Sequence, residues 1–140
     1  MLDLSQDGIF TVENTATDDW RTFRIETQPM DAAFAPGKRV LALLVGPSNS
    51  RNYKSFGFII QNQSTIQNEP GHYVSVWKSK RAEAEEPSDY EKFAKMLNYL
   101  AVTPSEKLQI LDAIPCHRCG ELLTVPKSIR AGMGPYCINQ

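Results

Sequence analysis

Five short apolar runs, separated by turn-forming residues, occupy the first eighty residues of the chain and limit its fold most strongly. The run WRTFRIET alternates apolar and polar residues, as a strand with one buried face does. The run RVLALLV is continuously apolar, which favours a strand covered on both faces. The other three runs are GIFTVE, YKSFGFIIQ and HYVSVWK, and polar, Gly- and Pro-containing loops lie between the runs. Residues 1–81 are therefore predicted to form an antiparallel meander or small open barrel.

The composition changes after Trp77, where KSKRAEAEEP is charged and predicts a linker. Ser88 followed by Glu91 forms a capping box, and apolar residues then recur at helical spacing, which predicts a helix over 89–101. Thr103 with Pro104 repeats the start signal and predicts a second helix that carries Leu108, Leu111 and Ile114. We expect both helices, within 82–115, to pack on the sheet. The predicted fold class is α+β, with a β-rich body, two short helices and a small tail.

The three cysteines of the chain all lie in that tail, residues 116–140. Cys116-x-x-Cys119, seventeen further residues and Cys137 match the first three positions of a known zinc-site spacing. Gly120 lets the backbone fold back after the second cysteine, and Pro126 to Arg130 can form a short helix stopped by Gly132 in a left-handed cap. A tail this short cannot bury enough apolar surface to fold alone, whereas a structural zinc contributes on the order of 10 kcal/mol. We expect a zinc knuckle rather than free thiols, a disulfide or a redox pair.

The fourth zinc ligand is left open by the spacing, because the template position is occupied by Gln140. His117 has the right chemistry but sits directly between two ligands, and His72 could reach the tail from the sheet. Glu121, Asp112, a water molecule and the terminal carboxylate are further candidates.

The tail also resembles a family of mostly uncharacterised bacterial and bacteriophage proteins that end in a zinc-ribbon-like segment. The residues that match are Cys116, Cys119, Gly120, Leu123, Thr124, Pro126, Ser128, Ile129, Gly132, Gly134, Pro135 and Cys137. The chain departs from the family pattern at Glu121, Val125 and Met133, where Arg, an acid and Ile are usual. The resemblance implies a zinc-ribbon-like tail and a phage or bacterial setting, without an activity.

Charge is distributed unevenly along the chain, although the net charge is only −1. Residues 38–81 hold seven basic residues and one acid, Glu69, whereas residues 1–37 hold seven acids and two arginines. Basic residues interleaved with aromatics suit single-stranded nucleic acid, although Trp77 and Tyr73 could equally pack beneath the helices. The candidate binding residues, for nucleic acid or a protein partner, are Tyr53, Lys54, Trp77, Lys78, Lys80, Arg81, Arg118, Lys127 and Arg130.

The segment KSFGFI, residues 54–59, is similar to the aromatic strands of RNA-recognition and cold-shock domains. Alternation decides which face is buried. Exposing Phe56 and Phe58 would leave Ser55, Gly57, Ile59 and Gln61 for the core, which is a poor core. We therefore expect Phe56, Phe58 and Ile60 to be buried together.

Few features indicate catalysis or membrane insertion. The chain has two histidines and no recognisable metalloprotease, phosphate-loop or nucleophile-elbow motif, so we expect a non-enzyme with no small-molecule substrate. Its N-terminus lacks a basic, apolar leader, which favours a soluble cytoplasmic protein. Two functions remain open: a zinc-containing accessory protein that binds nucleic acid, and a module such as a phage-encoded inhibitor or adaptor that docks on a host protein complex.

Overall fold

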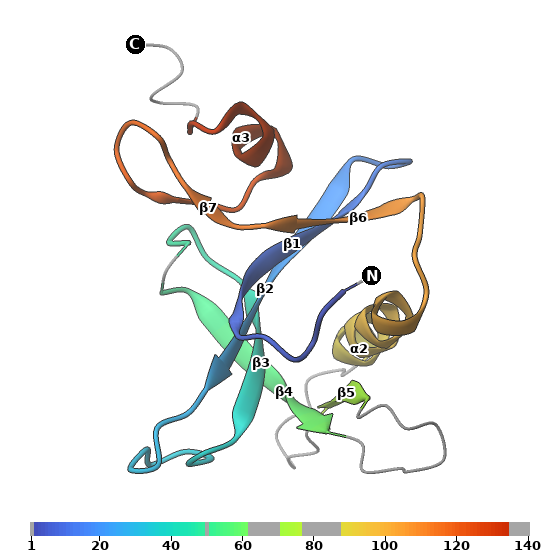
Figure 1. Cartoon of the computed structure of the whole chain (residues 1–140), viewed down its shortest axis with the longest axis vertical. Coiled ribbons are helices and arrows are strands. Elements are labelled where there is room, and N and C mark those ends of the chain that lie inside the picture. The colour runs from blue at the N-terminus through green and yellow to red at the C-terminus, as the bar shows by residue number, and fades with distance from the viewer. Residues whose placement is uncertain (1, 50, 62–70, 77–87, 135–140) are drawn as a thin grey trace. The chain divides into compact units, whose positions relative to one another are not determined.

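The computed structural model describes residues 2–49, 51–61, 71–76 and 88–134 (Figure 1). The chain forms two compact units, each assembled from separate stretches. Unit 1 comprises Met1–Asp7, Ile25–Ala42 and Ser55–Pro104, and unit 2 comprises Gly8–Arg24, Leu43–Lys54 and Ser105–Gln140. No helix among the described residues is long and apolar enough to cross a membrane.

Six strands form one antiparallel sheet in the order β5-β4-β3-β2-β1-β6. The first five are β1 (Gly8–Asn14), β2 (Asp19–Thr27), β3 (Arg39–Leu44), β4 (Tyr53–Gln61) and β5 (His72–Val76). Each of them lies within one of the five apolar runs or extends it by a residue, and they follow one another in chain order across the sheet, as a meander does. The predicted β-rich α+β fold is confirmed.

The remaining elements are α2 (Ser88–Val102), β6 (Leu108–Asp112), β7 (Ile114–Pro115), β8 (Leu122–Leu123) and α3 (Pro126–Ala131). The first predicted helix is confirmed by α2, which buries Ala94, Leu97 and Leu100 in unit 1. The Ser88 side chain, and with it the capping box, lies outside the described residues. The linker predicted after Trp77 lies there as well.

The second predicted helix, with Leu108, Leu111 and Ile114, is wrong. Residues 108–112 form β6, which pairs antiparallel with β1 from Phe10↔Asp112 to Asn14↔Leu108, and Ile114 belongs to β7. Pairing with a strand about a hundred residues away in sequence supplies the backbone hydrogen bonds that a helix would have made internally. The apolar spacing of this segment fits either structure, so periodicity alone could not decide.

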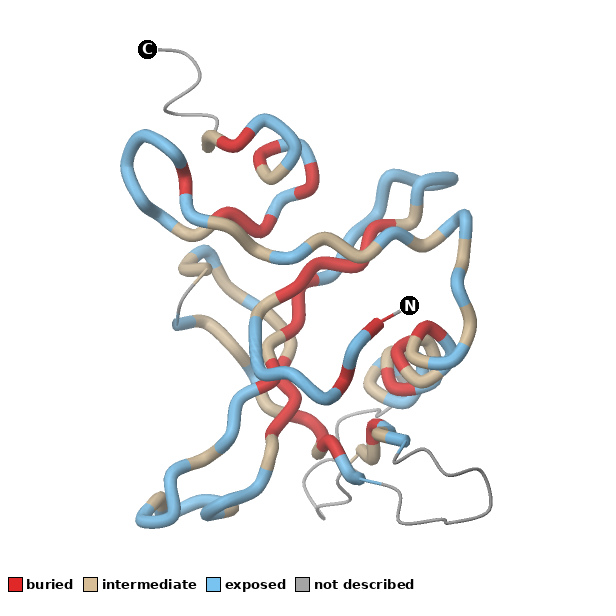
Figure 2. Tube along the Cα trace, in the orientation of Figure 1, coloured by how far each residue is buried: buried red, intermediate tan, exposed pale blue. Residues whose placement is uncertain are grey.

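In unit 2, β1 and β2 have one apolar face and one polar face. Phe10 and Val12 are buried on the apolar face, where the rings of Phe10 and Phe23 stack with centroids 5.7 Å apart. The polar face carries three buried polar side chains, Thr11, Glu13 and Thr22. Figure 2 shows the buried stretch along these strands. Buried polar groups need hydrogen-bond partners, so this face marks where another part of unit 2 attaches.

The edge of the sheet at β5 is protected by a side chain from α2. The Val74 N–H donates to Asn98 Oδ1 at 2.6 Å, and Asn98 Nδ2 donates to the Val74 carbonyl at 3.1 Å. Asn98 therefore makes hydrogen bonds to the N–H and the carbonyl of Val74, the two groups that a further strand would bond at this edge. Figure 1 shows α2 next to β5, and the packing of α2 against this strand completes unit 1.

Candidate metal centre

The first two cysteines lie in a tight turn between β7 and β8. The two strands pair as Ile114↔Leu123 and Pro115↔Leu122, and the Cys116 N–H donates to the Glu121 carbonyl at 2.7 Å. The Gly120 N–H donates to the Cys116 carbonyl at 2.9 Å, and Gly120 has a φ of 78°, in the left-handed region. The predicted fold-back at Gly120 is confirmed, and this hairpin with its turn is called the knuckle below.

The Cys116 sulfur is the focus of the knuckle. Hydrogen bonds from the backbone N–H groups of Cys119, Gly134 and Arg118 lower the pKa of the Cys116 thiol to about 6, against the opposing effect of burial. Cys116 is buried and Cys119 is exposed, and the two do not form a disulfide with each other. Backbone N–H groups directed at sulfur favour the thiolate, the form that binds a metal ion.

The short helix α3 follows the knuckle and ends as predicted. Gly132 caps it in the left-handed conformation with a φ of 71°, and the His117 N–H donates to the Gly132 carbonyl at 2.9 Å. A Cβ atom placed on Gly132 would lie 2.8 Å from Cε1 of the His117 ring. The His117 imidazole therefore lies against Gly132, at the end of α3.

The other predicted ligands are placed as follows. Cys137 lies outside the described residues, as does the carboxyl terminus. His72 lies in β5 of unit 1, paired with Gln61, whereas Glu121 and Asp112 are exposed in unit 2. Among the residues that the structure describes, no three His, Cys, Asp or Glu side chains gather as a complete metal site.

One loop residue, Asn49, attaches the knuckle to the segment between β3 and β4. Its Nδ2 donates to the Leu122 carbonyl at 2.9 Å, and its Oδ1 accepts from Thr124 Oγ1 at 2.9 Å. The Asn49 carbonyl in turn accepts from the Tyr53 hydroxyl at 2.8 Å. Sequence reasoning assigned this segment to a loop and missed the role of Asn49; its only signal is an amide side chain able to donate and accept at once.

The polar face of β1 and β2 supplies a second attachment. Thr11 Oγ1 donates to the Thr124 carbonyl at 2.5 Å and lies 2.8 Å from Thr22 Oγ1. Because the single hydroxyl proton of Thr11 is directed at Thr124, Thr22 must be the donor to Thr11. These buried threonines join β2, β1 and the residue after β8 in one chain of hydrogen bonds.

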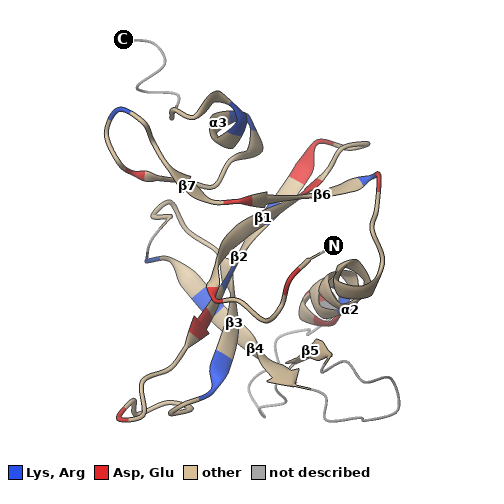
Figure 3. Cartoon of the chain, viewed as in Figure 1, with Lys and Arg blue, Asp and Glu red and all other residues tan. Residues whose placement is uncertain are grey.

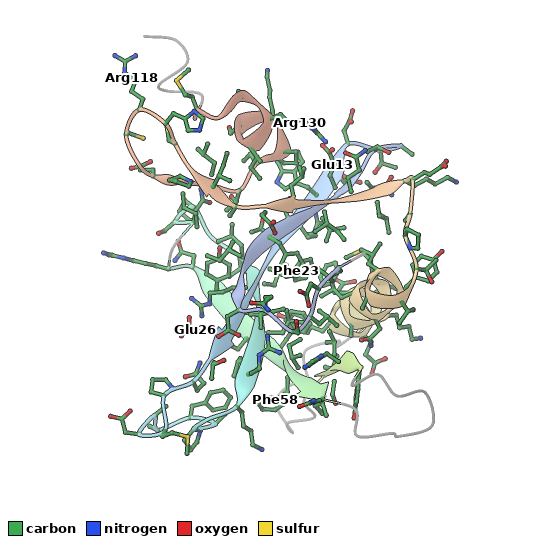
Figure 4. The ribbon with its side chains drawn as sticks, in the orientation of Figure 1. Glu13, Phe23, Glu26, Phe58, Arg118 and Arg130 are labelled. Atoms are coloured by element: carbon green, nitrogen blue, oxygen red, sulfur yellow. The ribbon has the colours of Figure 1, made fainter. Side chains whose placement is uncertain are left out.

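Arg130 makes the third attachment, from α3. Its guanidinium bonds both carboxylate oxygens of Glu13, at 2.5 and 3.3 Å, and donates to Gln109 Oε1 at 3.1 Å. Figure 4 shows Arg130 and Glu13 directed toward each other. Arg130 was predicted as a binding residue, and in the structure it connects α3 to β1 and β6.

Tyr53 is likewise engaged within unit 2. The Arg24 guanidinium lies over its ring, 4.6 Å from the centroid, while burial raises the pKa of the Tyr53 hydroxyl despite that positive charge. Lys54, Arg118 and Lys127 have exposed side chains, and Arg118 extends outward from the knuckle in Figure 4. Trp77, Lys78, Lys80 and Arg81 lie outside the described residues.

Comparison of the chain with family models, curated proteins and solved structures gave no match.

Proposed function

We propose that this chain is a small zinc-containing accessory protein, of phage or bacterial origin, that binds nucleic acid in the cytoplasm of a bacterial cell. Cys116, Cys119 and Cys137 hold the metal, and the fourth ligand stays open, with His117 as the candidate in the same turn. The observation that carries the metal assignment is the Cys116 sulfur, on which three backbone N–H groups converge. When bound, zinc would supply folding free energy to the tail and no catalytic chemistry.

Unit 2, which contains the knuckle, also carries exposed basic side chains that could contact a polyanion. Arg118 projects from the knuckle, Lys127 lies in the first turn of α3, and Lys54 lies in β4, all with exposed side chains. Figure 3 marks the basic residues along the chain. The sequence adds an excess of six positive charges over residues 38–81. A protein that neutralises phosphates with such residues releases counterions, so its affinity falls with salt.

The nucleic-acid role is tested by titrating labelled single-stranded and duplex DNA with zinc-loaded protein at several salt concentrations. We expect a steep loss of affinity with salt, and a smaller slope for Arg118→Gln and Lys127→Gln, by about one each. Lys92→Gln, which removes an exposed positive charge from α2, is the control and leaves the slope unchanged. Absent binding, or affinity that does not depend on salt, contradicts the proposal.

A second candidate function, docking on a host protein, is favoured by the loop between β2 and β3. Met30 and Phe34 are 83% and 51% exposed there, although both side chains are large and apolar. A pull-down from bacterial lysate under nuclease treatment separates the two functions. A stoichiometric protein partner that is lost with Met30→Ser and Phe34→Ser supports docking, whereas loss of every partner on nuclease treatment supports the nucleic-acid role.

A further inference from the structure

One face of β4 and β5 carries exposed aromatic and apolar side chains. Directly paired residues of antiparallel strands point to the same face, so the pairs Phe58↔Ser75 and Ile60↔Tyr73 share one face. Ile60 and Tyr73 are 37% and 41% exposed, and Phe58 is half-buried. We call Phe58, Ile60 and Tyr73 the aromatic face; Figure 4 labels Phe58 on it.

The expectation that Phe56, Phe58 and Ile60 are buried together is correct only for Phe56. Phe56 is covered because its ring stacks on Tyr90 of α2, with centroids 4.9 Å apart. The buried face of this strand pair instead carries Gly57, Ile59 and Val74.

Gly57 lies where the backbone of β5 approaches β4 closely. A Cβ atom at Gly57 would lie 2.9 Å from the Ser75 carbonyl oxygen, so position 57 has no room for a side chain. A glycine inside a strand often marks such a close approach of a neighbouring backbone. Ile59 and Val74, on the face that looked poor as a core, are buried, and Phe56 on the opposite face is buried as well.

The aromatic face is next to a positive charge. Lys38 Nζ lies 5.5 Å from the centroid of the Phe58 ring, and the Lys38 side chain is exposed. In antiparallel pairs, diagonal neighbours such as Phe58 and Tyr73 lie about 7–8 Å apart, within reach of successive bases of an extended strand. Rings that take bases and an ammonium group that contacts phosphate are the two components of a single-strand binding surface.

We propose that the aromatic face binds single-stranded nucleic acid, with bases stacked on Phe58 and Tyr73 and Lys38 on a phosphate. This inference rests on the nucleic-acid role proposed above and specifies its ligand and its surface. Single strands are favoured over duplexes because base faces are available for stacking only when bases are unpaired. Lys38, on its flexible stem, moves from the ring to the phosphate when a base arrives.

The test measures the affinity of zinc-loaded protein for a labelled oligothymidine and for a labelled duplex by fluorescence anisotropy. Tyr73→Ala and Phe58→Leu are each expected to weaken single-strand binding by about tenfold, because each removes one stacking ring. Lys38→Gln lowers the slope of log affinity against log salt by about one. Tyr73→Phe keeps the ring and should restore affinity close to that of the native chain.

Tyr99 provides the matched control, because it is an aromatic residue 52% exposed in α2 of the same unit. Tyr99→Ala should leave binding unchanged, and thermal unfolding of each variant verifies that the fold is retained. If nucleic acid binds but Tyr73→Ala and Phe58→Leu have as little effect as Tyr99→Ala, the binding role of the aromatic face is contradicted while the proposed function stands. Equal affinity for duplex and single strand also overturns it. Absence of binding to any nucleic acid overturns both.

Discussion

The side-chain amide of Asn49 donates a hydrogen bond to the main-chain carbonyl of Leu122 across 2.9 Å. The same side chain accepts a hydrogen bond from Thr124, so one loop residue secures both the second strand of the knuckle and the residue that follows it. The cysteine turn is thus positioned by hydrogen bonds within unit 2 as well as by the proposed metal.

Replacing Asn49 tests that relationship. Asn49→Ala should lower the free energy of unfolding by about 1–3 kcal/mol, because two partly buried partners lose their hydrogen bonds. Asn49→Asp keeps the acceptor for Thr124 but sets a carboxylate oxygen against the Leu122 carbonyl, so its loss should be at least as large. Urea unfolding measures both, and an unchanged Asn49→Ala variant would show that the contact is unimportant.

The buried threonines make a second prediction. Thr11→Val leaves the Thr124 carbonyl without its donor and the Thr22 hydroxyl without its acceptor, which should cost about 2 kcal/mol. The double variant Thr11→Val with Thr22→Val should cost less than the sum of the single variants, since the orphaned hydroxyl is then removed. Strictly additive losses in urea unfolding would mean that the two hydroxyls do not interact.

Two glycines of the tail provide a matched pair. Both have left-handed backbones, but a Cβ atom at Gly120 would have nothing within 4 Å, whereas one at Gly132 would clash with the His117 ring. Gly120→Ala should therefore cost about 1–2 kcal/mol from backbone strain alone, and Gly132→Ala should cost more. In the His117→Ala background the excess at Gly132 should disappear. Equal losses at the two glycines would contradict the packing of His117 against the end of α3.

Asp7 gives the protein a pH dependence. Burial of Asp7 is outweighed by hydrogen bonds from the Thr27 N–H and the Arg39 guanidinium, which hold the pKa of this carboxyl below its ordinary value. A carboxyl with a lowered pKa stabilises the fold above its ordinary pKa of about 4, and that stabilisation is lost as the pH falls through the lowered value.

The measurement compares urea unfolding of Asp7→Asn and the native chain at different pH. The variant should be less stable at pH 7, and the difference should narrow as the pH drops below the ordinary pKa of aspartate. Because Asp7 and Arg39 are partly exposed, added salt should also reduce the difference. If the difference in free energy of unfolding between the variant and the native chain does not change with pH, the effect of the variant does not come from the charge of Asp7.

Local patterns in the sequence predicted local structure well. The strand runs, the α2 periodicity and the glycine stop at Gly132 all depend on neighbouring residues, and each appears as expected. The failures involve partners distant in sequence. The apolar spacing of residues 108–114 is ambiguous until Phe10–Asn14 supplies a strand to pair with, and Asn49 looks like an ordinary loop residue until Leu122 and Thr124 lie beside it.

The buried face of β4 was misjudged for a different reason. Alternation assigns the residues of the strand to two faces, and side-chain size suggests that the face with the larger side chains is the buried one. Here Ile59 of the face with the smaller side chains is buried, and the Ser75 backbone approaches Gly57 so closely that no side chain fits there, whereas Phe58 of the opposite face is half-buried. That approach depends on the neighbouring strand and cannot be read from the KSFGFI segment.

The central claim is that one zinc ion joins Cys116, Cys119 and Cys137, and metal analysis of the native, reduced chain tests it most directly. We predict one zinc per chain, and loss of zinc in Cys116→Ser and Cys137→Ser. We also predict that a chelator removes the amide-exchange protection of the knuckle while that of α2 persists. Native protein that contains no zinc, with a knuckle equally protected in the presence of chelator, would contradict the claim.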